Sequence, residues 1–116
     1  MSSRRKERFL ALASLEFGNL SKEELQELYC KYLKAGMHGL CFSPYMEGQK
    51  PGDQLSEEQI RRRMEIIKPY TKWIRSFSTT EGNELIPKIA KEMGLKTLVG
   101  AWLGSDPEIN EKEVSN

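Results

Sequence analysis

The chain has 116 residues, enough for one small domain, whereas a complete (β/α)₈ barrel needs roughly 250 residues. Its 18 lysine and arginine residues nearly balance its 17 aspartate and glutamate residues, so charge gives no reason to expect nucleic acid or an anionic membrane as a partner. No apolar run approaches the ~20 residues of a membrane span. The composition therefore predicts a small globular domain that binds neither nucleic acid nor a membrane.

The N-terminus only partly imitates a signal peptide. A basic run at residues 4–6 is followed by an apolar stretch at residues 9–15. That stretch has about 7 residues, the lower limit for a signal peptide, and it is flanked by Glu7 and Glu16. We therefore do not expect export through this segment, and a cytoplasmic location is favoured.

The first clear helix is expected to begin at Ser21. Ser21 and Glu24 form a capping box, in which a hydroxyl and a carboxylate each accept a hydrogen bond from a free backbone N–H group. Gly36 is placed to end this helix, and residues 1–36 are assigned to an N-terminal extension and helix. Apolar residues recur along it at the spacing of one helix face: Leu25, Leu28, Tyr29, Tyr32 and Leu33.

Three short apolar segments, at residues 39–45, 73–79 and 97–102, predict strands. Continuous apolar character suits strands that are buried on both faces of a parallel sheet. Residues 47–55, which follow the first segment, contain two glycines, a proline and an aspartate and predict a loop.

Helices are expected after each of these segments. Ser56 and Gln59 form a second capping box, a third helix runs from about residue 84 to residue 93, and Asp106 with Pro107 opens another. Alternating strands and helices predict an α/β fold with a parallel sheet. Residues expected to face inward are Ile60, Met64 and Ile67 in one helix and Leu85, Ile86, Ile89, Ala90 and Met93 in the next.

Function in such a fold is expected beyond the carboxyl ends of the strands. Each predicted strand end carries an aromatic side chain, and Arg75 and several hydroxyl groups accompany them. Rings offer apolar faces to a sugar, and Arg, Ser and Thr can hydrogen-bond its hydroxyls, so the composition suits a neutral carbohydrate. Two alternatives stay open: the rings are core residues, and Arg75 forms a structural ion pair inside a barrel.

No cofactor or metal ion is expected. The sequence contains no glycine-rich phosphate loop, and His38 has no metal-ligand spacing with the two cysteines. Cys30 falls on an apolar helix stripe and Cys41 lies in a strand segment, so both are expected to be buried free thiols, with a disulfide between them left open.

Five stretches between residues 37 and 113 share their order and spacing with one known family. They are Gly-Leu-Cys-Phe-Ser-Pro-Tyr at 39–45 with the following Glu-Gly-Gln and Pro-Gly turns, Ser-Glu-Glu-Gln-Ile at 56–60, Trp-Ile-Arg-Ser-Phe-Ser-Thr at 73–79, residues 82–94, and Val-Gly-Ala-Trp-Leu-Gly at 99–104. Together they resemble bacterial family 17 glycoside hydrolase-like proteins of the β-1,3-glucanase type. The resemblance does not cover residues 1–36.

This resemblance implies a (β/α)₈ TIM barrel that cleaves or rearranges β-1,3-glucan with retention of configuration. Residues 37–116 would form its first three β/α units. The family's catalytic glutamates follow later strands, so the resemblance implies that they lie beyond this chain, and we expect residues 1–116 alone to be inactive. The family's Gly-Asn-Glu acid motif is imitated by residues 82–84, but these fall at a helix start, where an acid is favoured by the helix dipole.

The resemblance also implies a glucan-binding wall. Phe77 departs from related plant enzymes, in which tyrosine is typical, so it lacks the hydroxyl for a hydrogen bond. The implied substrate-binding residues are Phe42 and Tyr45 from the first strand, Arg75 and Phe77 from the second, and Trp102 from the third.

A non-catalytic glycan-binding or self-assembling module is the alternative function. It would keep the aromatic wall and find its missing strands in another copy or a partner. Three parallel strands alone leave two open sheet edges and one uncovered face, so we expect the chain alone to be molten, aggregated or self-associated rather than a rigid monomer. A small flavodoxin-like domain with an unrelated function is a further alternative.

Overall fold

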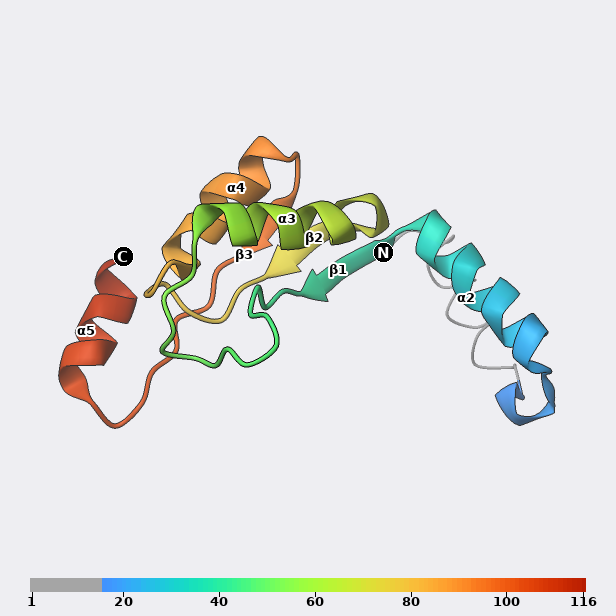
Figure 1. The fold of residues 1–116 in the computed structure, drawn as a ribbon, viewed down its shortest axis with the longest axis horizontal. Helices are drawn as coiled ribbons and strands as arrows, with labels where there is room; N and C mark the ends of the chain where they lie inside the picture. Colours follow the sequence, from blue (N-terminus) through green and yellow to red (C-terminus); the bar gives the residue numbers. More distant parts are fainter. Residues whose placement is uncertain (1–15) are drawn as a thin grey trace. The chain divides into compact units, whose positions relative to one another are not determined.

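The computed structural model describes residues 16–116 (Figure 1). The basic run and apolar stretch within residues 4–15 lie outside the described residues. The chain divides into two units between Tyr32 and Leu33, and residues 33–116 form one compact unit. In chain order the described elements are η1 (Phe17–Asn19), α2 (Lys22–Ala35), β1 (Met37–Cys41), α3 (Glu57–Ile67), η2 (Lys68–Tyr70), β2 (Thr71–Arg75), η3 (Asn83–Leu85), α4 (Ile86–Glu92), β3 (Lys96–Leu98) and α5 (Pro107–Ser115).

Helix α2 begins with the predicted capping box. The Ser21 N–H donates to Glu24 Oε2 at 2.7 Å, and the Glu24 N–H donates to Ser21 Oγ at 3.2 Å. The expected apolar face is only partly sheltered, because no residue of α2 is buried. The 3.6-residue period therefore predicted the helix correctly, although its apolar face remains largely in solvent.

The sheet is parallel, as predicted, with the strands in the order β1-β2-β3. Cys41, Arg75 and Leu98 lie side by side in its register. Each strand begins and ends earlier along the chain than the apolar segments predicted. The last bonds that continue the ladder run from the Phe42 N–H to the Arg75 carbonyl and from the Ser76 N–H to the Leu98 carbonyl.

Helices α3 and α4 pack against each other and lie on one side of the strands (Figure 1). Asp106 caps α5 as predicted, and Ser56 caps α3 by accepting the Gln59 N–H at 3.2 Å. The predicted capping box at Ser56 is only half formed, because the Gln59 side chain donates to the Pro44 carbonyl instead. The inward residues of α3 and α4 are largely those that the helical period predicted. The buried apolar core consists of Phe42, Leu55, Ile60, Met64, Ile74, Ile86, Ile89, Ala90 and Leu95.

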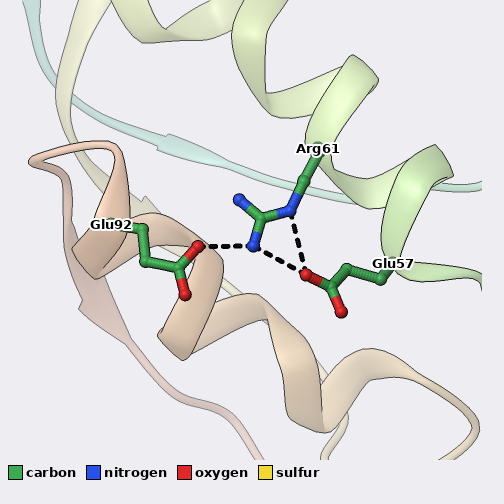
Figure 2. Close-up of polar contacts among 3 residues, drawn as sticks. All are labelled: Glu57, Arg61 and Glu92. Carbon is green, nitrogen blue, oxygen red and sulfur yellow. Dashed lines mark hydrogen bonds and ion pairs between the residues drawn. The ribbon is translucent and has the colours of Figure 1, made fainter.

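Arg61 joins α3 to α4 at the surface (Figure 2). Its guanidinium bonds Glu57 one turn earlier, at 2.6 Å from Nη2, and also Glu92 near the end of α4. The hydrogen bond and charge of Arg61 lower the pKa of the Glu57 carboxyl. All three side chains remain accessible to solvent, so the bridge contributes little to stability.

Both cysteines were expected to be buried, and both are free and exposed. Cys30 lies on α2, which buries none of its residues. Cys41 ends β1 on the sheet face opposite the core, in register with exposed Arg75 and Leu98. The prediction for Cys30 failed because the apolar stripe of α2 buries no residue, and that for Cys41 failed because this strand end faces the uncovered side of the sheet.

Candidate functional site

A cavity of ≈ 480 Å³ lies at the carboxyl ends of the three strands. Its walls come from the loops that follow β1, β2 and β3 and from α5. Four of the five predicted substrate-binding residues line it: Phe42, Tyr45, Phe77 and Trp102. These rings therefore converge from three separate strand ends, although strand-end loops rather than the strands themselves carry them.

The loop after β1 is held by polar side chains of α3. Gln59 Nε2 donates to the Pro44 carbonyl at 2.8 Å, and Arg63 Nη2 donates to the Tyr45 carbonyl at 2.9 Å. Phe42 is only 5% exposed and belongs to the core as well as the cavity. Tyr45 packs against the core, and its hydroxyl accepts from Asn83 Nδ2 at 3.4 Å. The Tyr45 hydroxyl proton is thus left free to donate to a ligand.

Trp102 is the most accessible ring of the cavity, at 66% exposed. Its backbone is nevertheless fixed, because the Trp102 N–H donates to Glu113 Oε2 at 2.9 Å. The loop that follows is closed by Asn110, which accepts from the Gly104 N–H at 2.8 Å and donates to the Gly104 carbonyl at 2.9 Å. An exposed ring on an ordered loop is suited to stacking against a ligand.

Arg75 lies outside the cavity lining. Its side chain is exposed on the uncovered sheet face, and its guanidinium lies 5.0 Å from the Phe77 ring centroid. It forms no ion pair within residues 16–116. The guanidinium therefore covers the back of one cavity ring instead of reaching the cavity.

Glu113 of α5 is the residue that sequence reasoning missed. It is only 3% exposed, and it lines the cavity between the ends of β2 and β3. Its carboxylate accepts from Ser78 Oγ, from Thr80 Oγ1 at 2.7 Å, from the Thr79 N–H at 3.0 Å and from the Trp102 N–H. The Thr79 and Trp102 N–H groups, which lie beyond the ends of β2 and β3, are therefore satisfied by this carboxylate.

The charge of Glu113 is stabilised by these contacts. Burial alone would raise the pKa of its carboxyl. The hydrogen bonds from Ser78, from the Trp102 N–H, from Thr80 and from the Thr79 N–H outweigh burial and lower the pKa to about 2. Glu113 is therefore an anion at neutral pH, with no proton to give as a general acid.

The Gly-Asn-Glu sequence at residues 82–84 builds the loop wall. Gly82 has φ 94°, and a Cβ there would lie 2.4 Å from the Leu55 carbonyl oxygen. Asn83 is buried and also donates to the Thr80 carbonyl at 3.0 Å. The Glu84 carboxylate accepts the Gly82 N–H at 2.8 Å. Each residue of the motif thus has a role in holding the loop.

Within residues 16–116, no group of three or more His, Cys, Asp and Glu side chains is arranged to hold a metal ion. The helices of this same part of the chain are all too short or too polar to cross a membrane. Comparison of the chain with protein-family models, with curated proteins and with solved structures found no match.

Proposed function

We propose that the cavity at the strand ends binds a β-1,3-linked glucan. The observation that carries this proposal is the convergence of Phe42, Tyr45, Phe77 and Trp102 on one cavity of ≈ 480 Å³. This volume falls within the range of ordinary small-ligand sites, which are lined by apolar rings with a few polar groups. The Tyr45 hydroxyl and the Ser78 and Thr80 side chains supply polar groups of that kind.

We further propose that these residues are the first β/α units of a (β/α) barrel enzyme, a retaining hydrolase or transglycosylase of β-1,3-glucan. The consecutive strand order β1-β2-β3 and a cavity at the carboxyl ends support this architecture. The catalytic glutamates of such an enzyme would lie outside residues 1–116. Glu81 and Glu113 line the cavity, but Glu113 is committed to the loop contacts described above.

A fluorescence titration tests the binding proposal. The chain contains two tryptophans, so the Trp73→Phe variant reports on Trp102 alone. Adding a soluble β-1,3-gluco-oligosaccharide should change its emission, and Trp102→Ala, which lacks this reporter and is measured by calorimetry, should lose most of the binding. Unchanged emission at millimolar sugar, in a sample shown to be folded by circular dichroism, would refute the proposal.

A second candidate is a non-catalytic, self-assembling glycan-binding module. It is favoured by large apolar side chains that remain exposed at and beyond β3, namely Leu98, Val99 and Leu103, because contiguous exposed apolar surface marks interaction sites. Size-exclusion chromatography over a range of concentrations, followed by glucan binding to the assembled fraction, tests this candidate. A concentration-dependent dimer or larger assembly that still binds glucan supports the module, and a monodisperse monomer counts against it.

A further inference from the structure

Two hydroxyl groups at the floor of the cavity have their protons already committed. Ser78 Oγ and Thr80 Oγ1 both donate to Glu113 Oε1. A hydroxyl has one proton and two acceptor lone pairs, and an ionised carboxylate can only accept. The 3.2 Å contact between Ser78 Oγ and Thr80 Oγ1 therefore has no proton to share.

The remaining capacity of both oxygens is for accepting. Ser78 Oγ already accepts the Thr80 N–H at 3.2 Å, which leaves it one lone pair. Thr80 Oγ1 keeps both of its lone pairs. Donation to an anion also increases the negative charge on the donor oxygen, which strengthens it as an acceptor.

The carboxylate of Glu113 has little capacity left for a ligand. Its Oε1 accepts two hydroxyls, and its Oε2 accepts the N–H groups of Thr79 and Trp102. It acts on a ligand through its neighbours and through its charge. Exposed Glu81 also lines the cavity and adds a second negative charge there.

We propose that Glu113 fixes Ser78 and Thr80 as hydrogen-bond acceptors, so that the cavity selects ligands whose hydroxyls donate and rejects ligands that present a carboxylate. This inference rests on the proposed glycan-binding function and deepens it. Ser78 and Thr80 determine specificity, and Glu113 is a positioning residue that acts through them. The hydroxyls of a neutral sugar can donate to both acceptors. The carboxylate of an acidic sugar would place its lone pairs against those of Ser78 and Thr80, and its negative charge near that of Glu113.

The test compares two ligands on the intact chain by calorimetry. One is a neutral β-1,3-gluco-oligosaccharide, and the other is the same oligosaccharide oxidised at C6 to the uronic acid. The wild-type chain should bind the neutral ligand at least about 10-fold more tightly, since several unmatched polar contacts separate the two. Thr80→Val should weaken neutral binding by about 3- to 10-fold, and Thr80→Ser should restore it.

The variant Glu113→Gln distinguishes this positioning role from a purely structural one, because only the positioning role predicts a change in the ratio of the two affinities. It removes the charge. The N–H groups of Thr79 and Trp102 require the amide oxygen at the Oε2 position, so the amide NH2 replaces Oε1 and donates to Ser78 and Thr80. Their protons can then turn toward the ligand, and the ratio of neutral to acidic affinity should fall toward one. Loss of loop order alone would weaken the binding of both ligands equally and leave the ratio of neutral to acidic affinity unchanged. Thr97→Val, in β3 and outside the cavity lining, is the matched control and should change neither affinity.

Three results would overturn the inference. They are equal affinity for both ligands in the wild type, equal affinities of Thr80→Val and Thr80→Ser, or an unchanged ratio in Glu113→Gln. In each case neutral binding that depends on Trp102 leaves the glycan-binding proposal standing. Binding of neither ligand by the folded chain overturns both proposals.

Discussion

The helix-covered face of the sheet and the rim at the strand ends are held together by different forces. On the covered face, Ile60, Met64 and Ile86 are completely buried apolar side chains. At the rim, the buried charge is the carboxylate of Glu113, and the loops gather around it through hydrogen bonds. The first region spreads its stabilisation over many contacts, whereas the second concentrates it on one charge. The two regions should therefore respond differently to truncation, to pH and to backbone change.

The largest effect is expected in the covered face. Ile60→Ala removes a side chain that is 0% exposed, and such truncations cost about 2–5 kcal/mol through lost burial and the cavity left behind. Ile66→Ala, in the same helix but 59% exposed, should stay within about 0.5 kcal/mol of the wild type. Urea unfolding followed by circular dichroism measures both. Similar losses in the two variants would show that α3 does not pack as described.

The rim should be the pH-sensitive region. The pKa of Glu113 is lowered in the folded state from its ordinary value of 4.5 to about 2. Its contribution to the free energy of unfolding is therefore fully present above about pH 4.5 and is lost as the pH falls toward 2. The loss amounts to at most about 3 kcal/mol.

Thermal unfolding between pH 2 and pH 7 measures this contribution. Glu113→Gln should be less stable than the wild type at neutral pH, and its stability should change less on acidification. Parallel pH curves for the two proteins would contradict the assignment of the acid-sensitive step to Glu113.

A backbone change in the cavity wall should have an intermediate effect. Gly82→Ala places a Cβ against the Leu55 carbonyl oxygen and strains a left-handed backbone, which should cost about 1–3 kcal/mol. Gly48→Ala is the control, because φ there is also positive, at 82°, but nothing lies within 4 Å of the added atom. It should lose only about 1 kcal/mol. Equal losses of unfolding free energy in the two variants, measured by chemical denaturation, would show that the close approach to Leu55 does not add to the cost of Gly82→Ala.

The smallest effect is expected where the two regions meet. Ser76 is 0% exposed, and its hydroxyl has no hydrogen-bond partner among the described residues. An unpaired buried hydroxyl is unfavourable, so Ser76→Ala should leave stability unchanged or raise it by up to about 1 kcal/mol. A marked destabilisation in the same denaturation assay would indicate that the hydroxyl has a partner in solution.

Local patterns in the sequence predicted the helices and their caps well. The capping box at Ser21, the N-cap of Ser56 and the inward residues of α3 and α4 depend on neighbours three or four positions away. The exposure of Cys41 depends instead on which sheet face lies open, and no local period contains that information. The strand bounds were misplaced for a related reason, since pairing with the neighbouring strand defines them and residues such as Thr79 bond instead to Glu113, 34 positions away.

The candidate site was predictable in part. The rule that ligands bind at carboxyl strand ends located four rings that do line one cavity. The rule could not distinguish Arg75 from these four rings. Arg75 lies next to the buried Ser76 in the sequence, but its side chain is on the opposite face of the sheet. Glu113 carried no signal in the sequence, because an acidic residue in an expected surface helix is ordinarily solvated.

The loop that carries Trp102 combines an accessible side chain with an immobilised main chain. Glu113 secures the Trp102 amide, and the paired bonds of Asn110 to Gly104 close the turn that follows. The conformational entropy of ordering this loop is therefore lost during folding, and little remains to be lost when a ligand arrives. In hydrogen-exchange experiments the Trp102 amide should be protected as strongly as amides of the sheet, even though its indole ring lies in water.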